Sequence, residues 1–597
     1  MDTPQVRARL GAVRCAMHRA GIDALIVPRA DEYLGEYLPP HNERLRWISG
    51  FSGSAGIVIV LHDSAAIFVD GRYTVQVRQQ VPADLFEFLH LVEEPHARWL
   101  GKRLGAGKRV GYDSRLHTLS WQRRTSEVLE ECSVALVTLE ENPIDRAWHD
   151  RPIPEIHPAV LLDQRFTGRA SLDKRREIGA LITGKGADAA LIFAADSIAW
   201  LLNIRGSDVP HMPVVLGYAL LAADGGMRFF TDIAKIPPGF EAHVGPGVEV
   251  LAQARYAQAL ASLGGQKILA DPDTANAWCQ LLLESSGARL IATPDPVLLP
   301  KACKNAAEID GMRRAHIRDA VAECRFLAWL DAEVAAGRLH DEAMLCERLF
   351  EFRADDELFR DLSFDTISAA GGNAAMCHYR HSDTDPGRLS MNSVYLVDSG
   401  AQYLDGTTDI TRTVAIGDPG AEIRRLATLV LKGHIALDQA RFPKGTTGTQ
   451  LDVLARQYLW QQGFDYDHGT GHGVGSFLSV HEGPQRIGKG WNATALAPGM
   501  VISNEPGYYK AGCYGIRHEN LLLVTELEVP AGSDQPMYGF EALTLVPFDR
   551  RLSDRTLLDA TEIAWLNRYH RRVATTIAPL LDGSDREWLL QATRALD

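Results

Sequence analysis

The stretch HGTGHGVGSFLSVHEGP, residues 468–484, combines three histidines with five glycines. His468 and His472 have the four-residue spacing of a helical zinc-binding pair, but the glycines between and beside them argue against a helix. The glycines also fit no G-x-G-x-x-G register, which argues against a phosphate-binding loop. Glycines at such density let the backbone pass close to a bound group. The stretch therefore predicts contact with a metal ion or a substrate.

Two stretches with β-type patterning each carry two acidic residues among apolar neighbours. Asp398 lies in YLVDSG and Asp409 in TTDIT, while Glu505 lies in ISNEPG and Glu519 in RHENLLLV. Burial of one unpaired carboxylate costs several kcal/mol or more. Four such carboxylates, two in each stretch, therefore predict a bound cation.

Each of these stretches reads as two strands joined by a glycine-containing reversal. If Asp398 and Asp409 face each other, the reversal must be centred between Tyr403 and Leu404. That centre precedes the tight-turn signal Asp405–Gly406. We therefore expect a longer or bulged connection in the first hairpin.

The second pair of carboxylates predicts its own hairpin. The midpoint between Glu505 and Glu519 is Gly512, inside KAGCYG, where a turn is expected in any case. Four carboxylates and one imidazole form an oxygen-rich site, which favours Mn²⁺ and leaves Co²⁺ or Zn²⁺ open. Two bridging carboxylates would hold two ions about 3.5–4 Å apart, as in hydrolytic two-metal sites.

Composition limits the class of protein. A chain of 597 residues, 46% hydrophobic and 23% charged, is too long for one core and indicates several domains. The net charge of −14 and the lack of a basic cluster argue against nucleic acid as a partner. No apolar run reaches the roughly 18–20 residues of a membrane span, and the first residues do not resemble a secretory signal. The eight dispersed cysteines indicate free thiols in a reducing compartment, so we expect a soluble cytoplasmic enzyme.

The chain divides at two breaks in the sequence pattern. GIDALIV at residues 21–27 and GADAALIF at residues 186–193 begin similar segments, which predicts two related α/β domains in tandem. A proline-rich linker at 142–158 separates them, and a second break lies at 294–305. Helical spacing follows from Ile309, and the tail after about residue 555 is also helical. The expected parts are an α/β domain at 1–155, a second at 156–302, a catalytic domain at 303–547 and a helical extension at 548–597.

Several motifs together resemble a known family. HGTGHGVGSFLSVHEGP, VDSGAQYLDGTTDITRT, NEPGYY and GIRHEN resemble the pita-bread metallopeptidases, and among them the aminopeptidase P (Xaa-Pro aminopeptidase) family. RWISGFSGSAG and VDGRYTVQ look like the first domain of that family, and WLNRYH looks like its C-terminal extension. The resemblance implies an α/β (α+β) chain in which two creatinase-N-like domains precede a pita-bread catalytic domain.

The resemblance also implies which residues hold the metal ions. Asp409 and Glu519 would bridge two ions, His472 and Glu505 would bind one of them, and Asp398 would bind the other. Glu505 would in addition carry the proton from the attacking water to the leaving nitrogen.

Further residues match positions of the family that contact the substrate. His378 in AAMCHYR would position the substrate, and His481 in SVHEGP would stabilise the tetrahedral intermediate. His468 and Arg72, the latter in DGRY, are also predicted to bind substrate. Arg517 would orient the ligand carboxylates from outside the ligand set.

One residue departs from the family pattern. His518 precedes the last ligand at a position where relatives usually have an aliphatic residue. Side chains alternate along a strand, so His518 should point away from Glu519 and should not be an extra ligand.

The implied activity is that of a metallo-aminopeptidase. It would release the N-terminal residue from peptides with proline at the second position, by attack of a hydroxide that bridges two metal ions. The family tends to form dimers, which predicts a homodimer. An Xaa-Pro dipeptidase (prolidase) is the alternative enzyme, with the same ligands but usually one N-terminal domain. A metal-free pita-bread binding protein is a third possibility, against which the intact ligand set argues.

Overall fold

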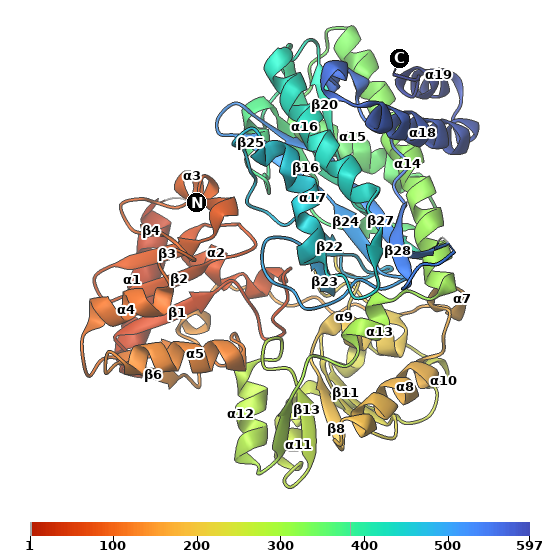
Figure 1. The fold of residues 1–597 in the computed structure, drawn as a ribbon. Coiled ribbons are helices and arrows are strands. Elements are labelled where there is room, and N and C mark those ends of the chain that lie inside the picture. Colours follow the sequence, from red (N-terminus) through yellow and green to blue (C-terminus); the bar gives the residue numbers. More distant parts are fainter. Residues whose placement is uncertain (1–2, 382–383, 530, 597) are drawn as a thin grey trace. The chain divides into compact units, whose positions relative to one another are not determined.

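The structure is a computed structural model that describes residues 3–381, 384–529 and 531–596. The chain forms two compact units (Figure 1). The first contains residues 1–164 and 169–298, and the second contains residues 165–168 and 299–597. Within the described ranges, no helix combines the length and the apolar character needed to cross a membrane.

The first unit contains two six-stranded sheets with the same topology. The first sheet has the order β4 (Glu87–His90), β3 (Ala65–Val69), β2 (Ile57–Leu61), β1 (Ala24–Pro28), β5 (Arg109–Tyr112) and β6 (Ala135–Thr138). The second has the order β12 (Val248–Ala252), β11 (Met227–Thr231), β10 (Tyr218–Ala222), β8 (Ala189–Ile192), β13 (Lys267–Ala270) and β14 (Arg289–Ala292). In both, the second, third and fourth strands are antiparallel neighbours and the remaining pairs are parallel. This agreement confirms the prediction of two related α/β domains.

Helices pack on both sheets because each carries an apolar face. In the first domain they are α1 (Thr3–Ala20), α2 (Arg44–Ser49), α3 (Gln76–Gln80), α4 (His96–Leu104), α5 (Leu119–Glu130) and α6 (Pro143–Ala147). In the second they include α8 (Ser171–Gly184), α9 (Ala195–Leu202), α10 (Phe240–Val244), α11 (Tyr256–Ala261) and α12 (Ala277–Ser285). Separate apolar clusters form the cores of these domains.

The second unit is built around several sheets of antiparallel strands. Its largest sheet has the order β21 (Phe442–Pro443), β28 (Met537–Ala542), β27 (Asn520–Leu527), β24 (Val501–Asn504), β22 (Gly471–Gly473) and β23 (Glu482–Ile487). A three-stranded sheet has the order β16 (Ile367–Ala370), β17 (Ser393–Ser399) and β20 (Ile410–Ile416). Smaller ladders are formed by β15 (Phe359–Leu362), β18 (Ala401–Tyr403) and β19 (Gly406–Thr407), and by β25 (Gly507–Lys510) and β26 (Tyr514–Arg517).

The helical spacing that follows Ile309 belongs to the longest helix of the second unit. Helix α14 (Ala306–Ala335) starts with a capping box of Asn305 and Glu308, and Gly337 follows its end in a left-handed conformation. Figure 1 shows this long helix along one side of the unit, in contact with α15 (Glu342–Ala354). Helices α16 (Ala421–Asp438) and α17 (Gly448–Trp460) pack against each other.

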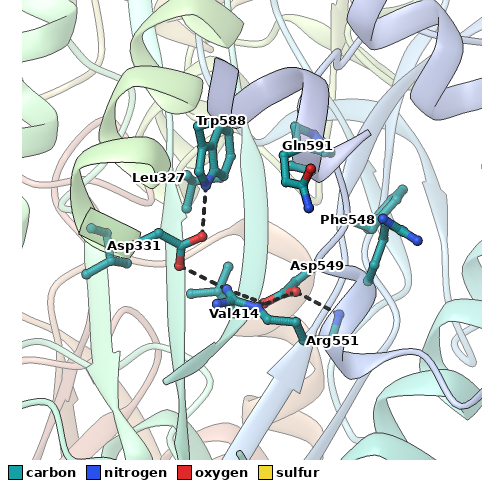
Figure 2. Close-up of a pocket in the computed structure, with 12 residues that line it drawn as sticks. Leu327, Asp331, Val414, Phe548, Asp549, Arg551, Trp588 and Gln591 are labelled. Atoms are coloured by element: carbon teal, nitrogen blue, oxygen red, sulfur yellow. Dashed lines mark hydrogen bonds and ion pairs between the residues drawn. The ribbon is translucent and has the colours of Figure 1, made fainter. Parts of the chain in front are cut away.

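The C-terminal helices share the core of the catalytic unit. Side chains of α18 (Ala560–Ile577) and α19 (Gly583–Ala592) belong to the same apolar cluster as residues of α14 and β27. A cavity of about 220 Å³ lies where α19 meets α14 and β20 (Figure 2). At its wall, the Trp588 indole donates to Asp331, which also pairs with Arg551.

Arg412 connects the C-terminal extension to the strands of the site. This fully buried β20 residue donates from Nη1 to the Glu519 carbonyl at 2.5 Å and from Nη2 to the Tyr569 hydroxyl at 3.1 Å. It also donates to the carbonyls of Val546 and Pro547. One guanidinium therefore joins β20, the start of β27 and α18.

Candidate metal centre

The first hairpin carries Asp398 on β17 and Asp409 directly before β20. Its turn is the two-residue connection between Tyr403 and Gly406, so the expected longer or bulged connection was wrong. Asp398 pairs with Thr411 and does not face Asp409 directly. A two-residue turn at Leu404–Asp405 thus determines the register, one residue earlier than the Asp405–Gly406 signal, and the two carboxylates lie diagonally on one face.

The second hairpin has the predicted register. Asn504 pairs with Asn520 and Gly507 pairs with Arg517, so Glu505 and Glu519 occupy opposite positions about Gly512. Gly512 has a φ of 69° in the connecting turn. The two carboxylates lie where the β24–β27 ladder ends and the β25–β26 ladder begins. This interruption of the ladder frees them to turn toward the histidine strand.

His472 lies among these carboxylates from the middle of β22. Its Nε2 atom is 3.4 Å from Asp409 Oδ2 and 3.4 Å from Glu505 Oε1. Its Nδ1 atom is 3.0 Å from the Gly473 carbonyl, which accepts the ring proton and leaves Nε2 facing the carboxylates. Ligand atoms of Asp409, His472 and Glu519 lie within 4.8 Å of one another. The structure thus brings together side chains from both hairpins and the glycine-rich stretch.

The electrostatics of this cluster favour a cation. Burial raises the pKa of Asp398 to about 7, and the nearby charges of Asp409 and Glu505 add to this against the opposing effect of Arg517. Burial likewise raises the pKa of Glu519 well above its usual range, with Asp409, Glu505 and Asp398 adding to the effect. The buried carboxylates therefore repel one another unless positive charge is bound between them.

The pKa of His472 is also raised, which in an imidazole favours the charged form. Burial alone would lower the pKa of His472, but the hydrogen bond to Asp409 and the charge of Glu505 raise it to about 9. A protonated His472 thus partly neutralises the carboxylates. A metal ion would displace that proton, because a ligating imidazole must be neutral.

The donor set fits divalent metal ions. Asp398 Oδ1 is buried and has no hydrogen-bond partner, while Oδ2 pairs with the Arg517 guanidinium. A buried carboxylate oxygen without a donor needs another positive partner. Carboxylate oxygens with one imidazole nitrogen match the preference of Mn²⁺, Co²⁺ or Zn²⁺.

Arg517 has the contacts expected of an orienting residue. Besides Asp398, its guanidinium donates from Nε to the Thr411 hydroxyl at 3.1 Å and from Nη1 to the Tyr509 hydroxyl at 2.8 Å. The Thr411 hydroxyl in turn donates to Glu519 Oε2 at 2.7 Å. Asp398 and Glu519 are therefore held through one connected set of hydrogen bonds.

His468 lies beside this set. Its Nε2 is 2.7 Å from the Tyr509 hydroxyl and its Nδ1 is 2.7 Å from the Gly469 carbonyl. Burial, with the charge of Arg517, lowers the pKa of His468 well below its ordinary value, so the ring is neutral. Both nitrogens are engaged here, and its predicted contact with substrate stays a prediction.

The other predicted substrate residues differ in their surroundings. His481 is exposed, and its ring packs edge-on against His472 with the centroids 4.4 Å apart. His378 is partly exposed and close enough to His468 to affect its pKa. Arg72 belongs to the first unit, where it pairs with Asp70 at 2.7 Å. Its role toward substrate remains a prediction.

His518 turns away from the metal centre as predicted. Its ring packs edge-on against Phe548 at 5.6 Å, and burial lowers its pKa to about 3. The neutral imidazole is part of the packing behind the site, which explains why it can replace an aliphatic residue.

Tyr509 and Ser503 also belong to the site, and neither was predicted from the sequence. Tyr509 connects Arg517 to His468, and Ser503 accepts from the His472 amide and donates to Glu505 Oε1 at 3.1 Å. The hairpin register contained a signal for both. Ser503 is two residues from Glu505, and Tyr509 is diagonal to Arg517 across the ladder, so each shares a face with its partner.

Comparisons with known proteins agree along the whole chain. Residues 9–146 and 150–308 match the Creatinase/Prolidase N-terminal domain, residues 310–526 match Metallopeptidase family M24, and residues 536–596 match the C-terminal region of peptidase M24. The probable Xaa-Pro aminopeptidase P of Tuber melanosporum is 39% identical over 598 residues, with 96% of each chain covered. The chain belongs to the Xaa-Pro aminopeptidase P family. Aminopeptidase P2 of Arabidopsis thaliana is also 39% identical, covering 96% of this chain and 86% of the relative.

Solved structures separate this family from the dipeptidases. The X-prolyl aminopeptidase of Caenorhabditis elegans, described as a cytosolic enzyme with a di-nuclear active site, has a TM-score of 0.94 at 33% identity. It covers 99% of this chain and 100% of its own. The Xaa-Pro dipeptidase of Bacillus anthracis has a TM-score of 0.50 at 23% identity and covers 64% of this chain. The dipeptidase shows the shared fold alone, whereas the Caenorhabditis elegans structure matches this chain across nearly its whole length, including both N-terminal α/β domains.

Proposed function

We propose that this protein is an Xaa-Pro aminopeptidase that releases the N-terminal residue from peptides with proline at the second position. The observation that carries the proposal is the full-length similarity to X-prolyl aminopeptidases, including both N-terminal α/β domains. The candidate metal centre supplies the chemistry that this activity needs.

Two divalent ions are proposed to bind the five predicted ligands. Asp409 and Glu519 would bridge them, His472 and Glu505 would bind one, and Asp398 would bind the other. Support comes from the cluster of Asp409, His472 and Glu519 and from the unpartnered Oδ1 of Asp398. We propose Mn²⁺ as the native ion, with Co²⁺ and Zn²⁺ as alternatives. Such ions supply Lewis-acid activation of water and of the peptide carbonyl.

Glu505 is the proposed proton carrier. Burial raises its pKa, while the charges of His472 and Arg517 oppose the shift. The Ser503 hydroxyl holds Oε1 at 3.1 Å, which orients the carboxylate. A carboxylate held in this orientation can take a proton from water and give it to the leaving nitrogen. The proline nitrogen leaves as an amine, so it must gain a proton as the C–N bond breaks, and Glu505 would deliver that proton.

The exposed histidines are proposed to contact the substrate. His481, packed on His472, would donate to the carbonyl oxygen as negative charge develops there. His378 would position the substrate from the proline side, and Arg72 and His468 complete the proposed substrate set. The free α-amine of the substrate would bind near the ion held by Asp398, which would account for the release of one residue at a time.

The proposed location and assembly rest on the relatives of this protein. The Caenorhabditis elegans relative is described as cytosolic, and we propose the same compartment for this protein. A homodimer is proposed on the family resemblance. Neither nucleic acid nor a membrane is proposed as a partner.

Peptide cleavage tests the function directly. Purified protein is stripped of metal, supplied with Mn²⁺ and given Arg-Pro-Pro or Ala-Pro, and the released N-terminal amino acid is counted. We expect metal-dependent release from the tripeptide and weak release from the dipeptide. An Asp409→Asn variant, which lacks a proposed bridging ligand, should be inactive. Preference for Ala-Pro would make the protein a prolidase, and no cleavage with any divalent ion would favour the metal-free binding protein.

A further inference from the structure

Glu342 is a buried carboxylate to which the mechanism above gives no role. It is the first residue of α15 and is fully buried. Its Oε1 accepts from the Ala370 amide at 2.7 Å and from Asn373 Nδ2 at 2.9 Å. Its Oε2 accepts from the Tyr379 hydroxyl at 2.7 Å and from the Gly387 amide at 2.8 Å. Four donors therefore stabilise a charge whose burial is otherwise costly.

All four donors lie in the described residues 370–381 and 384–387, a segment that starts at the end of β16. Ala370 is the last residue of β16, and Gly387 lies at the far end of the segment. The Glu342 amide also donates to the Gly387 carbonyl at 2.8 Å. A single helical residue thus holds both ends of the segment, and through Tyr379 it holds the middle.

The middle of this segment carries His378, the proposed substrate residue. Tyr379 directly follows it, and the Tyr379 hydroxyl is shared between Glu342 and Asn373. The Tyr379 ring packs on an apolar cluster that includes Leu396 of β17, two residues before Asp398. The backbone at His378 is therefore fixed on one side by the strand of a proposed metal ligand and on the other by Glu342.

The backbone of Gly387 packs closely against the Glu342 carboxylate. A Cβ atom on Gly387 would lie 2.5 Å from Asn373 Nδ2 and 2.7 Å from Glu342 Cδ. Only glycine lets the backbone come this near without displacing the carboxylate. The segment is built around Glu342 at three separate points.

We propose that Glu342 is a positioning residue for His378, joining Tyr379 to Ala370 and Gly387 so that the imidazole is held where it meets the proline side of the substrate. This inference rests on the proposed function, because it assigns Glu342 through the proposed role of His378. A displacement of a substrate-positioning group by about 1 Å can lower catalysis about 100-fold. Loss of the carboxylate should therefore affect peptide cleavage more than metal binding.

The test combines single and double variants in the full-length, Mn²⁺-loaded protein. Glu342→Gln keeps the size of the side chain but replaces one acceptor oxygen with an amide that cannot accept from its donors. We expect kcat/KM for Arg-Pro-Pro to fall about 10- to 100-fold, with bound metal unchanged. His378→Ala should also lower kcat/KM. In the His378→Ala background, Glu342→Gln should lower kcat/KM for Arg-Pro-Pro by less than about threefold, because both changes remove the same function.

Two further variants keep the test decisive. Tyr379→Phe leaves the carboxylate in place and removes one donor, so it should give a smaller loss of the same kind even if Glu342→Gln folds poorly. Glu562→Gln is the matched control, because Glu562 is also a buried carboxylate near a helix start but binds Lys432 and caps α18. It should leave kcat/KM within about twofold of the parent, since surface and structural changes elsewhere act independently.

Specific outcomes would overturn the inference. Unchanged cleavage by both Glu342→Gln and Tyr379→Phe would remove the role of Glu342. An equal loss from Glu342→Gln with and without His378 would show that Glu342 does not act through the histidine. A parent protein that releases no amino acid from Arg-Pro-Pro would instead refute the proposed function.

Discussion

The Nε2 atom of His468 lies 2.7 Å from the hydroxyl oxygen of Tyr509. His468 Nδ1 donates to the Gly469 carbonyl, so Nε2 must accept the Tyr509 proton. The Tyr509 oxygen then accepts from Arg517, the residue that pairs with Asp398. Neutral His468 thus determines the direction of the Tyr509 hydroxyl. That hydroxyl in turn holds the Arg517 guanidinium beside Asp398, a proposed metal ligand.

Removal of that hydroxyl should slow the reaction without releasing metal. We predict that Tyr509→Phe lowers kcat for Arg-Pro-Pro about tenfold, because a hydrogen bond to a charged group contributes about 1.5–3 kcal/mol. Steady-state kinetics and metal content by atomic emission check this. Tyr508→Phe is the control, since the Tyr508 ring packs on Phe464 outside the network. Equal losses in both variants would contradict the role of Tyr509.

The glycine-rich stretch should be sensitive to a single added methyl group. A Cβ on Gly471 would lie 2.0 Å from the Ser503 carbonyl oxygen of the neighbouring strand. We predict that Gly471→Ala separates β22 from β24, lowers the free energy of unfolding by about 1–3 kcal/mol and weakens metal binding. Denaturant titration and metal titration measure the two effects. Gly490→Ala, whose new Cβ would meet only Arg486 Nη2 at 3.8 Å, should change neither.

Glu519 should destabilise the metal-free protein as the pH rises. Its pKa is raised in the folded state, so the folded form holds a proton more tightly than the unfolded chain. Stability is therefore lost as pH rises from the unfolded pKa through the folded one. We predict that Glu519→Gln raises the Tm of EDTA-treated protein, by an amount that grows from pH 5 upward.

The same substitution should reverse its effect when metal is present. With Mn²⁺ bound, the parent gains stability from the ligand, and Glu519→Gln should have the lower Tm. Glu526→Gln, an exposed residue on the same strand, controls for the loss of charge alone. A lower Tm for Glu519→Gln without metal would show that the carboxylate is compensated in another way.

Metal binding should release protons in a defined pH range. His472 has a pKa of about 9 and Asp398 one of about 7 in the metal-free site, and both groups must be deprotonated to act as ligands. We predict that Mn²⁺ affinity rises with pH from about 6 and levels off above about 9. Calorimetry in buffers of different ionisation enthalpy counts the protons. The release should fall by about one proton in His472→Ala, and an unchanged count would contradict this assignment.

Local sequence signals predicted the parts of the site that depend on spacing. The register of Glu505 and Glu519 followed from a turn centred on Gly512, and the structure confirms it. The prediction of a longer or bulged connection in the first hairpin was wrong, because two acidic residues that share a site need not face each other directly. There the turn at Leu404–Asp405 determines the register, and a diagonal arrangement of Asp398 and Asp409 suffices.

Contacts between distant segments could not be predicted in the same way. A glutamate in the first turn of a helix is usually solvated and favourable there through the helix dipole, so Glu342 gave no sign of burial. Its donors lie 28 to 45 residues further along the chain. The link from Tyr509 to His468 spans 41 residues and requires the strands to be placed first. Such partners follow from the fold and not from any local pattern.

Arg412 makes six hydrogen-bond contacts, which also include the Thr411 carbonyl and Asn520 Oδ1, and they link the candidate metal centre to the C-terminal extension. Its acceptors include the Glu519 carbonyl on one side and Tyr569 of α18 on the other. In a related chain that ended before α18, the buried Arg412 guanidinium would still lie against Glu519, a proposed ligand, but it would have lost the Tyr569 hydroxyl as an acceptor. Loss of the extension would therefore select for replacement of Arg412 as well. The two are expected to be gained and lost together among related proteins.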